Sequence, residues 1–177
     1  MIETNFTPFQ NLITNRLILR PLETTDDKDI FAHRSNNDVN TFLVDFRHSS
    51  IEQTREFIDR VQKEIMNHKT LLWVITPKDT NKFIGTICLW NISVNEAKAE
   101  AGYTLDPQFQ GMGYMNEALI KVIDFGFNSM KLKLIEAYTH ENNQGSIKLL
   151  LKNKFRQDNT PEKQIGNNRI FFTLVFS

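Results

Sequence analysis

The sequence of 177 residues predicts an α/β (α+β) fold, with a mixed, mainly antiparallel sheet and helices on both of its faces. The first observation is the order of segments: strand, two helices, three strands, helix, strand, helix, strand. Consecutive strands joined by short turns pair antiparallel, whereas a strand–helix–strand unit pairs in parallel. The second is the length, which suits one domain with a real core. Because no linker interrupts the pattern, we expect a single domain over residues 1–177.

The N-terminal part predicts one strand followed by two helices. Arg16–Arg20 indicates a short strand that ends at Pro21. Thr24–Asp27 carries the signals of a helix start. Residues 34–50 predict a loop with a short helical turn. Residues 50–68 show apolar side chains at helical spacing and predict an amphipathic helix.

Three strands come next, without a helix between them. The first covers Leu71–Ile75 and is closed by Pro77. Phe83–Trp90 returns after a polar turn, which indicates a hairpin. Ala97–Leu105 forms the third and ends before Pro107, because proline cannot donate to a sheet ladder.

The C-terminal part alternates helices and strands. Residues 113–130 predict a helix and residues 132–139 a strand. A short helix over residues 145–153 follows. The last strand covers residues 169–176 and is preceded by a strong turn signal.

Composition excludes several classes of function. Lys and Arg together number 21, as do Asp and Glu, so the chain lacks the basic excess of a general nucleic-acid binder. No stretch approaches the roughly 20 apolar residues of a membrane span, and the N-terminus has no signal-peptide pattern. The single cysteine, Cys88, lies in an apolar run and is expected to be a buried thiol. The four histidines lack metal-ligand spacing. We therefore expect a cytoplasmic protein without a metal.

A turn between the third of the consecutive strands and the next helix carries the strongest functional signal. Its Gly111 and Gly113 let the backbone turn sharply and approach a ligand. The first amides of the following helix attract an anion such as a pyrophosphate. A tight turn that binds nothing is the alternative. A dinucleotide site is disfavoured, because Asn116 stands where the third glycine belongs and Glu136 lies inside a strand.

This turn resembles a known signature. Gln108-x-x-Gly111-x-Gly113 is similar to the acetyl-CoA signature of the GNAT superfamily of N-acetyltransferases. Five further motifs, in order along nearly the whole chain, resemble its Rim-type branch, the ribosomal-protein N-terminal acetyltransferases. They are Thr14–Pro21, Gly102-Tyr103-x-Leu105, Gly113-Tyr114-x-x-Glu117-Ala118, Asn143–Ser146 with the residues up to Leu150, and Phe172–Leu174.

The resemblance implies a GNAT-like sheet in which two central strands splay apart. One ends at Leu105 and the other begins at Leu132, and the pantetheine arm of acetyl-CoA would lie between them. Acetyl-CoA is then the cosubstrate. The residues implied to bind it are Tyr103, Thr104, Leu105, Gln108, Gln110, Gly111, Met112, Gly113, Tyr114, Met115, Asn143 and Ser146.

Acetyl transfer to an amine needs a group that accepts the proton of the amine and a donor for the thioester oxygen. We expect Glu100 to be the base, because it lies in the strand that ends at the implied site. A solvated strand residue, or a partner for Lys98, is the alternative. The backbone N–H of Leu105 is the candidate donor to the oxygen.

The acid that assists the leaving thiolate is less clear from the residues. Many GNAT enzymes place a tyrosine four residues after the position of Ser146, and Leu150 stands there in this chain. Ser146 is therefore the candidate acid. Tyr103, Tyr114 and Tyr138 remain as alternatives.

The function implied is transfer of an acetyl group from acetyl-CoA to a primary amine, first of all the α-amine of a protein or peptide N-terminus. One alternative is a small-molecule amine, namely a polyamine, an amino-acid derivative or an aminoglycoside. Asp38 and Asp45 offer negative charge for such a cation, and His48 lies in the same loop. Another alternative is a non-catalytic acyl-CoA sensor. No direct nucleic-acid or membrane partner is expected, and the Phe-rich C-terminal strand suits a homodimer.

Overall fold

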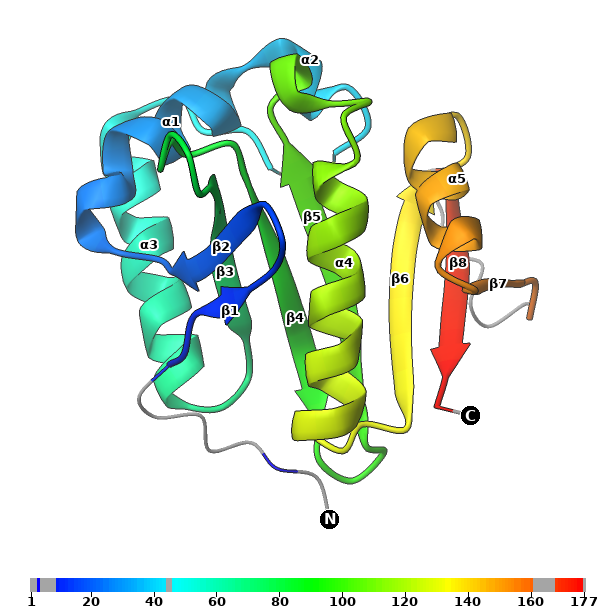
Figure 1. The fold of residues 1–177 in the computed structure, drawn as a ribbon. Helices are drawn as coiled ribbons and strands as arrows, with labels where there is room; N and C mark the ends of the chain where they lie inside the picture. The colour runs from blue at the N-terminus through cyan, green and yellow to red at the C-terminus, as the bar shows by residue number, and fades with distance from the viewer. Residues whose placement is uncertain (1–2, 4–8, 44–45, 161–167, 177) are drawn as a thin grey trace.

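The computed structural model describes residue 3 and residues 9–43, 46–160 and 168–176. Its strands form one sheet in the order β1-β2-β3-β4-β5-β6-β8-β7 (Figure 1). The strands are β1 Leu12–Ile13, β2 Leu17–Pro21, β3 Leu71–Pro77, β4 Gly85–Ser93, β5 Lys98–Leu105, β6 Leu134–His140, β7 Arg156–Asp158 and β8 Arg169–Val175. The helices are α1 Asp27–Ser35, α2 Asn37–Asn40, α3 Ile51–Met66, α4 Tyr114–Asp124 and α5 Gln144–Lys152.

Neighbouring strands of this sheet are antiparallel except for β5 and β6, which are parallel. The parallel pair is the one that encloses α4, as expected for a strand–helix–strand unit. The predicted mixed, mainly antiparallel fold is confirmed.

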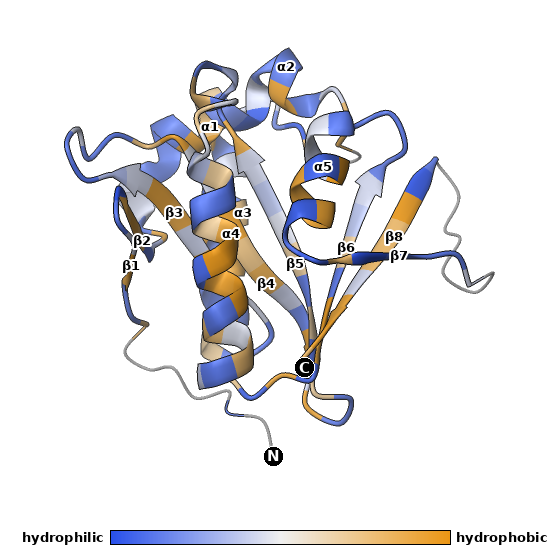
Figure 2. Ribbon diagram, turned by 45° about the vertical axis from the view of Figure 1, so that its right-hand side comes forward, coloured by the Kyte–Doolittle hydropathy of each residue, from blue (hydrophilic) through white to orange (hydrophobic). Residues whose placement is uncertain are grey.

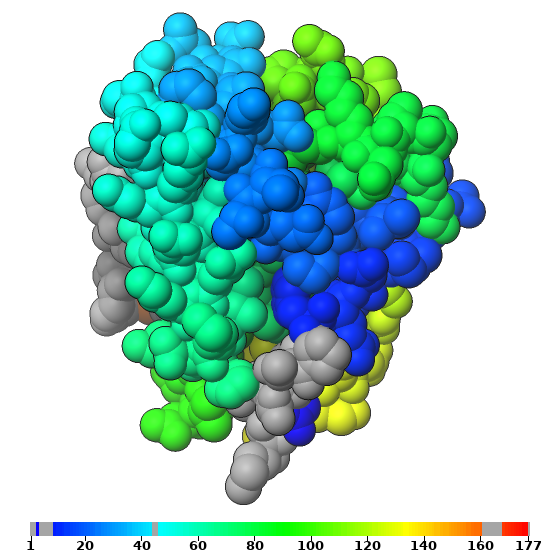
Figure 3. Space-filling model, turned by 90° about the vertical axis from the view of Figure 1, so that its left-hand side faces the viewer, coloured from blue at the N-terminus to red at the C-terminus, as the bar shows by residue number. Residues whose placement is uncertain are grey.

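Helices cover both faces of the sheet, and β3 shows why. Every residue of β3 is buried, because its side chains alternate between two apolar cores. On one face its side chains pack with those of α4, and α5 adds Leu150 to the same core (Figure 2). On the other face they pack with Ile30 of α1 and with Ile58 and Val61 of α3. These two helices form the surface of that face (Figure 3).

The structure differs from the sequence-based expectation at several element ends. The helix expected over residues 113–130 is regular only to Asp124 and then widens into a π turn over Phe125–Ser129, in which Met130 N–H donates to the Phe125 carbonyl at 3.0 Å. The short helical turn expected in the loop after α1 is present as α2. Two short strands, β1 and β7, were not expected, because they pair with β2 and β8 over only two and three residues.

Gly85 allows the close approach of β4 and β5 at the end of the sheet that leads to the turn. It pairs with Leu105, and a Cβ atom at this position would overlap the backbone oxygen of Thr104 and lie 3.0 Å from Leu105 Cα. A side chain here would push the end of β5 away from β4, because neither contact atom belongs to a flexible side chain.

We predict that Gly85→Ala lowers the free energy of unfolding by about 1–3 kcal/mol, the usual cost of overpacking. Urea unfolding measures the change. Gly145→Ala is the matched control for stability, because its Cβ would meet only Asn143 Oδ1, at 3.7 Å. Equal urea midpoints for Gly85→Ala and the wild type would show that β4 and β5 tolerate the extra methyl group.

Candidate functional site

The two parallel strands of the sheet separate after a short stretch of pairing. β5 and β6 pair at Lys98–Leu134, Ala99–Ile135 and Glu100–Glu136. Beyond Glu100, β5 continues to pair with β4 alone, and β6 pairs with β8 alone (Figure 1). The edge of β5 that faces β6 is therefore left without a strand partner over residues 101–105.

The backbone of Leu105 faces this gap. The N–H of the next residue, Asp106, donates to the Ile84 carbonyl at 2.8 Å and so points toward β4. Since successive residues of a strand direct their N–H groups to opposite sides, the N–H of Leu105 points away from β4. The carbonyl of Leu105 lies on the gap side as well and accepts a hydrogen bond from Gln110 Nε2 at 3.1 Å. A backbone donor is thus available at the end of β5.

The turn after β5 folds as its glycines predict. Asp106 accepts the N–H of Gln108 at 2.9 Å and starts a 3-10 turn. Gly111 and Gly113 then adopt φ values of 75° and 80°, a region that favours glycine. Apart from its two chain neighbours, no described residue has an atom within 4 Å of where a Cβ of Gly111 would be, so this backbone faces open space. The helix α4 begins directly afterwards, at Tyr114.

The segment between β1 and β2 holds this turn against α4. The carboxylate of Glu117 accepts hydrogen bonds from Thr14 Oγ1 at 2.6 Å, Arg16 N–H at 2.7 Å and Arg16 Nε at 2.7 Å. Arg16 also donates from Nη1 to the Met112 carbonyl at 3.0 Å. Burial alone would raise the pKa of Glu117, but the hydrogen bonds and the charge of Arg16 outweigh it, so the pKa is lowered. Hydrogen bonds from Thr14 and Arg16 therefore hold the glycine turn in place.

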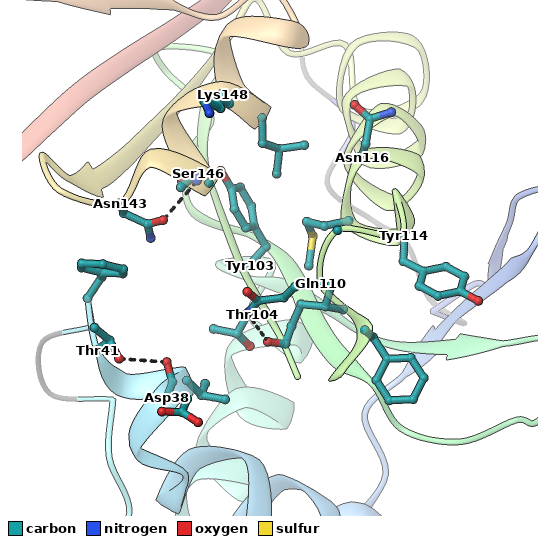
Figure 4. A pocket seen from close by; sticks show the side chains of 18 of the residues that line it. Asp38, Thr41, Tyr103, Thr104, Gln110, Tyr114, Asn116, Asn143, Ser146 and Lys148 are labelled. Atoms are coloured by element: carbon teal, nitrogen blue, oxygen red, sulfur yellow. Dashed lines mark hydrogen bonds between the residues drawn. The ribbon is translucent and has the colours of Figure 1, made fainter. Parts of the chain in front are cut away.

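The first turn of α5 forms the opposite wall. Asn143 caps this helix by accepting the N–H of Ser146 at 3.1 Å. Ser146 Oγ lies 2.9 Å from the hydroxyl of Tyr103, which reaches across from β5 (Figure 4). Lys148 and Lys152 follow on the same helix, one turn apart, and both line the space between the walls.

The walls enclose a pocket of about 490 Å³. Helix α2 and the residues after it close one end, where the ring of Phe42 lies 5.6 Å from that of His140. Asp38 is the one acidic residue among the described residues that line the pocket. The described lining residues are Asp38, Val39, Thr41, Phe42, Leu43, Tyr103, Thr104, Leu105, Phe109, Gln110, Gly111, Gly113, Tyr114, Met115, Asn116, Asn143, Gly145, Ser146, Lys148, Leu149 and Lys152.

Most of the residues expected to bind the cosubstrate meet in this pocket. Gln108 and Met112 do not line it; the carbonyl of Met112 is bound by Arg16 instead. The residues that do line it are Tyr103, Thr104, Leu105, Gln110, Gly111, Gly113, Tyr114, Met115, Asn143 and Ser146.

Glu100 lies outside the pocket lining, on the sheet face opposite to that of Tyr103. Its neighbours Ala99 and Ala101 point into the core under α4, so alternation directs Glu100 to the face of α1 and α3. Burial raises the pKa of Glu100 to about 7, although a hydrogen bond from Asn91 Nδ2 at 3.2 Å works against the shift. The group thus changes charge near neutral pH, beside the last pair before the strands separate.

Sequence reasoning missed two parts of the pocket. The i, i+4 spacing of Lys148 and Lys152 after a helix start was a visible signal, since it places both on one helix face. The second part is the rim from α2: Asp38 was expected to offer negative charge to a cationic acceptor and does line the pocket, but the place of Phe42 was not predictable, because it depends on how the chain after α1 folds back over the sheet. Asp45 lies outside the described residues.

In the described ranges, no group of three or more His, Cys, Asp or Glu side chains is placed to hold a metal ion. None of the described helices is long and apolar enough to cross a membrane.

Comparison with known proteins gives a consistent result. A family model described as an acetyltransferase (GNAT) domain matches residues 16–156. A curated relative from Bacillus subtilis (strain 168), the uncharacterized N-acetyltransferase YoaA, is 31% identical over 160 residues, which cover 90% of each chain.

Solved structures share the fold at lower identity. The ribosomal-protein-S5-alanine acetyltransferase from Vibrio fischeri has a TM-score of 0.81 and 21% identity, over 94% of this chain and 96% of that one. The microcin C7 self-immunity acetyltransferase MccE, solved with acetyl-CoA and AMP, has a TM-score of 0.81 and 20% identity, over 92% and 93% of the two chains.

Proposed function

This chain belongs to the GNAT acetyltransferase family, and from that premise we propose that it acetylates the α-amine at the N-terminus of a protein or peptide. The general activity is that of an acetyl-CoA-dependent N-acetyltransferase. The specific acceptor is the proposal. We further propose that residues 1–177 act as one domain in the cytoplasm, and that a homodimer is compatible with the exposed C-terminal Val175 and Phe176.

The observation that carries the proposal is the pocket between β5 and α5. Its volume, its open backbone at Gly111 and its pair of lysines on α5 suit a large ligand with phosphate groups. Positive φ angles and the first amides of α4 form a cradle for a pyrophosphate. The residues therefore fit acetyl-CoA, which supplies a reactive acetyl thioester.

Each predicted site residue takes a role in this proposal. The pocket residues Tyr103 to Leu105, Gln110, Gly111, Gly113 to Met115, Asn143 and Ser146 hold the cosubstrate, with the pantetheine arm along the free edge of β5. Met112 keeps the turn in shape through the bond of its carbonyl to Arg16. Gln108 shapes the turn through its bond to Asp106. Leu105 N–H stabilises the oxygen that gains charge during transfer. Glu100 accepts the proton of the amine, which reaches the gap from the face of α1 and α3.

The choice of a protein N-terminus is supported by likeness and by chemistry. The structural neighbour from Vibrio fischeri bears the name of a ribosomal-protein-alanine acetyltransferase. At neutral pH, a fraction of an N-terminal α-amine is uncharged, because its pKa is about 7.7–8.0. An amine of this kind needs only a base that titrates near 7, as Glu100 does.

A small cationic amine is the second candidate. It is favoured by Asp38, whose carboxylate lies at the pocket end formed by α2, and by the likeness to an immunity acetyltransferase. A non-catalytic acyl-CoA sensor is the third, since Leu150 removes the usual tyrosine.

One assay separates the three candidates. Release of free CoA thiol is followed with acetyl-CoA and three acceptors: peptides with free N-termini, the same peptides with blocked N-termini, and small amines. The proposal requires turnover with the free peptides only. Turnover confined to small amines would assign the second candidate, and binding of acetyl-CoA without any turnover would assign the sensor.

Binding of acetyl-CoA is predicted to stabilise the fold. At about a hundred times its Kd, the ligand adds roughly 2.7 kcal/mol to the free energy of unfolding, seen as a rise in melting temperature. Gly111→Glu is expected to abolish the rise, because it places a carboxylate and a strained backbone where the phosphates bind. Ile120→Glu is the control: it adds the same charge on α4 at a residue that is 53% exposed, and it is expected to keep the rise in melting temperature. A missing rise in the wild type would contradict binding at this turn.

The activity is predicted to increase as the pH rises through about 7, because Glu100 must lose its proton to act as a base. Glu100→Gln is expected to lower kcat/KM by about 10²–10⁴ and to remove this inflection. Steady-state rates from pH 5 to 9, measured with acceptors of different amine pKa, identify the enzyme group. Glu96→Gln, on the turn before β5, is the control. An unchanged inflection in Glu100→Gln would assign the base elsewhere.

A further inference from the structure

The hydroxyl groups of Tyr103 and Ser146 meet across the pocket. Their oxygens are 2.9 Å apart, although the two residues lie 43 positions apart in the chain (Figure 4). One comes from the free part of β5 and the other from the first turn of α5. Both line the pocket, so their hydrogen bond lies at its wall.

The direction of this hydrogen bond follows from the two groups. A phenol is a stronger donor than an aliphatic hydroxyl, and burial raises the pKa of Tyr103 to about 12, so Tyr103 keeps its proton. The backbone N–H of Ser146 is already bound to Asn143 Oδ1 at 3.1 Å. Within the described part of the chain, the Ser146 hydroxyl bonds only to Tyr103. Both properties favour Tyr103 as the donor, an arrangement in which Ser146 keeps a proton for a third group.

The residue one helical turn after Ser146 supplies no hydroxyl donor. Leu150, one helical turn after Ser146, is completely buried in the core beneath α4 and α5 and carries no hydroxyl. The phenol of Tyr103 reaches the same helix from the neighbouring strand. The Ser146 hydroxyl on α5 thus has its hydrogen-bond partner on β5, in the phenol of Tyr103.

We propose that Tyr103 is a positioning residue that orients the Ser146 hydroxyl toward the sulfur of the acetyl thioester. This inference rests on the proposed function. During transfer, the amine nitrogen bonds to the acetyl carbon, the C–S bond breaks with its electron pair going to sulfur, and the surplus proton of the amine leaves to the base. A hydroxyl that is already aimed at the sulfur stabilises its new negative charge without reorganisation.

The first test needs no acceptor. The thiol of CoA bound to the protein is titrated by its thiolate ultraviolet absorbance. In the wild type its pKa is expected to lie about one pH unit below that of free thiol, since a hydrogen bond to a charged group is worth about that much. Tyr103→Phe, which keeps the ring, and Ser146→Ala are each expected to return the pKa of the bound CoA thiol to that of free thiol. A bound thiol that titrates alike in all three proteins would overturn the inference.

The second test is a double-mutant cycle on turnover. Tyr103→Phe and Ser146→Ala are each expected to lower kcat about tenfold, with the Kd of acetyl-CoA unchanged. The double variant loses no more than Ser146→Ala alone, because the two hydroxyls act as one unit. Losses that multiply would show independent roles. Ser129→Ala, at an exposed position of the π turn beyond α4, is the control.

The two proposals fail in different ways. If CoA does not bind the wild type, the proposed function itself is wrong. If CoA binds and its thiol titrates as in solution, the cosubstrate site stands and the role of Tyr103 falls.

Discussion

The parallel contact between β5 and β6 is the constraint on which the site depends. It covers three residue pairs and ends at Glu100 and Glu136. Parallel strands need a long crossover, which α4 provides, and this places the glycine turn beside the point of separation. Had the ladder continued, the backbone of Tyr103 and Leu105 would be satisfied by β6. Because the ladder is interrupted, these backbone groups can bond to a ligand, and the protein itself has fewer internal hydrogen bonds.

The ligand-binding turn is held by residues from the start of the chain. Arg16 and Glu117 form an ion pair at 2.7 Å with side chains 43% and 19% exposed. An isolated pair at this exposure contributes little, but Glu117 accepts two further hydrogen bonds, from Thr14 and from the backbone of Arg16. A network of charged hydrogen bonds gives more fixed geometry than a single pair. The turn is thereby kept in place before any ligand arrives.

Local patterns predicted the regular elements and the glycine turn, because each depends on neighbouring residues. The two short strands β1 and β7 were not predicted, because each forms by pairing with the edge of a longer strand, β2 or β8. The π turn after Asp124 depends on packing, since a Cβ at Gly126 would lie 3.1 Å from Ile135 Cδ1. In the site, the rim from α2 and the contact of Tyr103 with Ser146 join distant segments. No spacing within the sequence reports such a contact.

The interrupted ladder also has a mechanical consequence. The sheet has two parts, one made of β1 to β5 and the other of β6, β8 and β7. Strand hydrogen bonds join the two parts at one end only. Beyond the last pair, β5 runs on for five residues, about 17 Å of strand. A small rotation at the joint therefore becomes a larger displacement at the far end, as in a lever. The strand pairs that join β5 to β6 therefore act on the width of the gap between the two strands from its closed end.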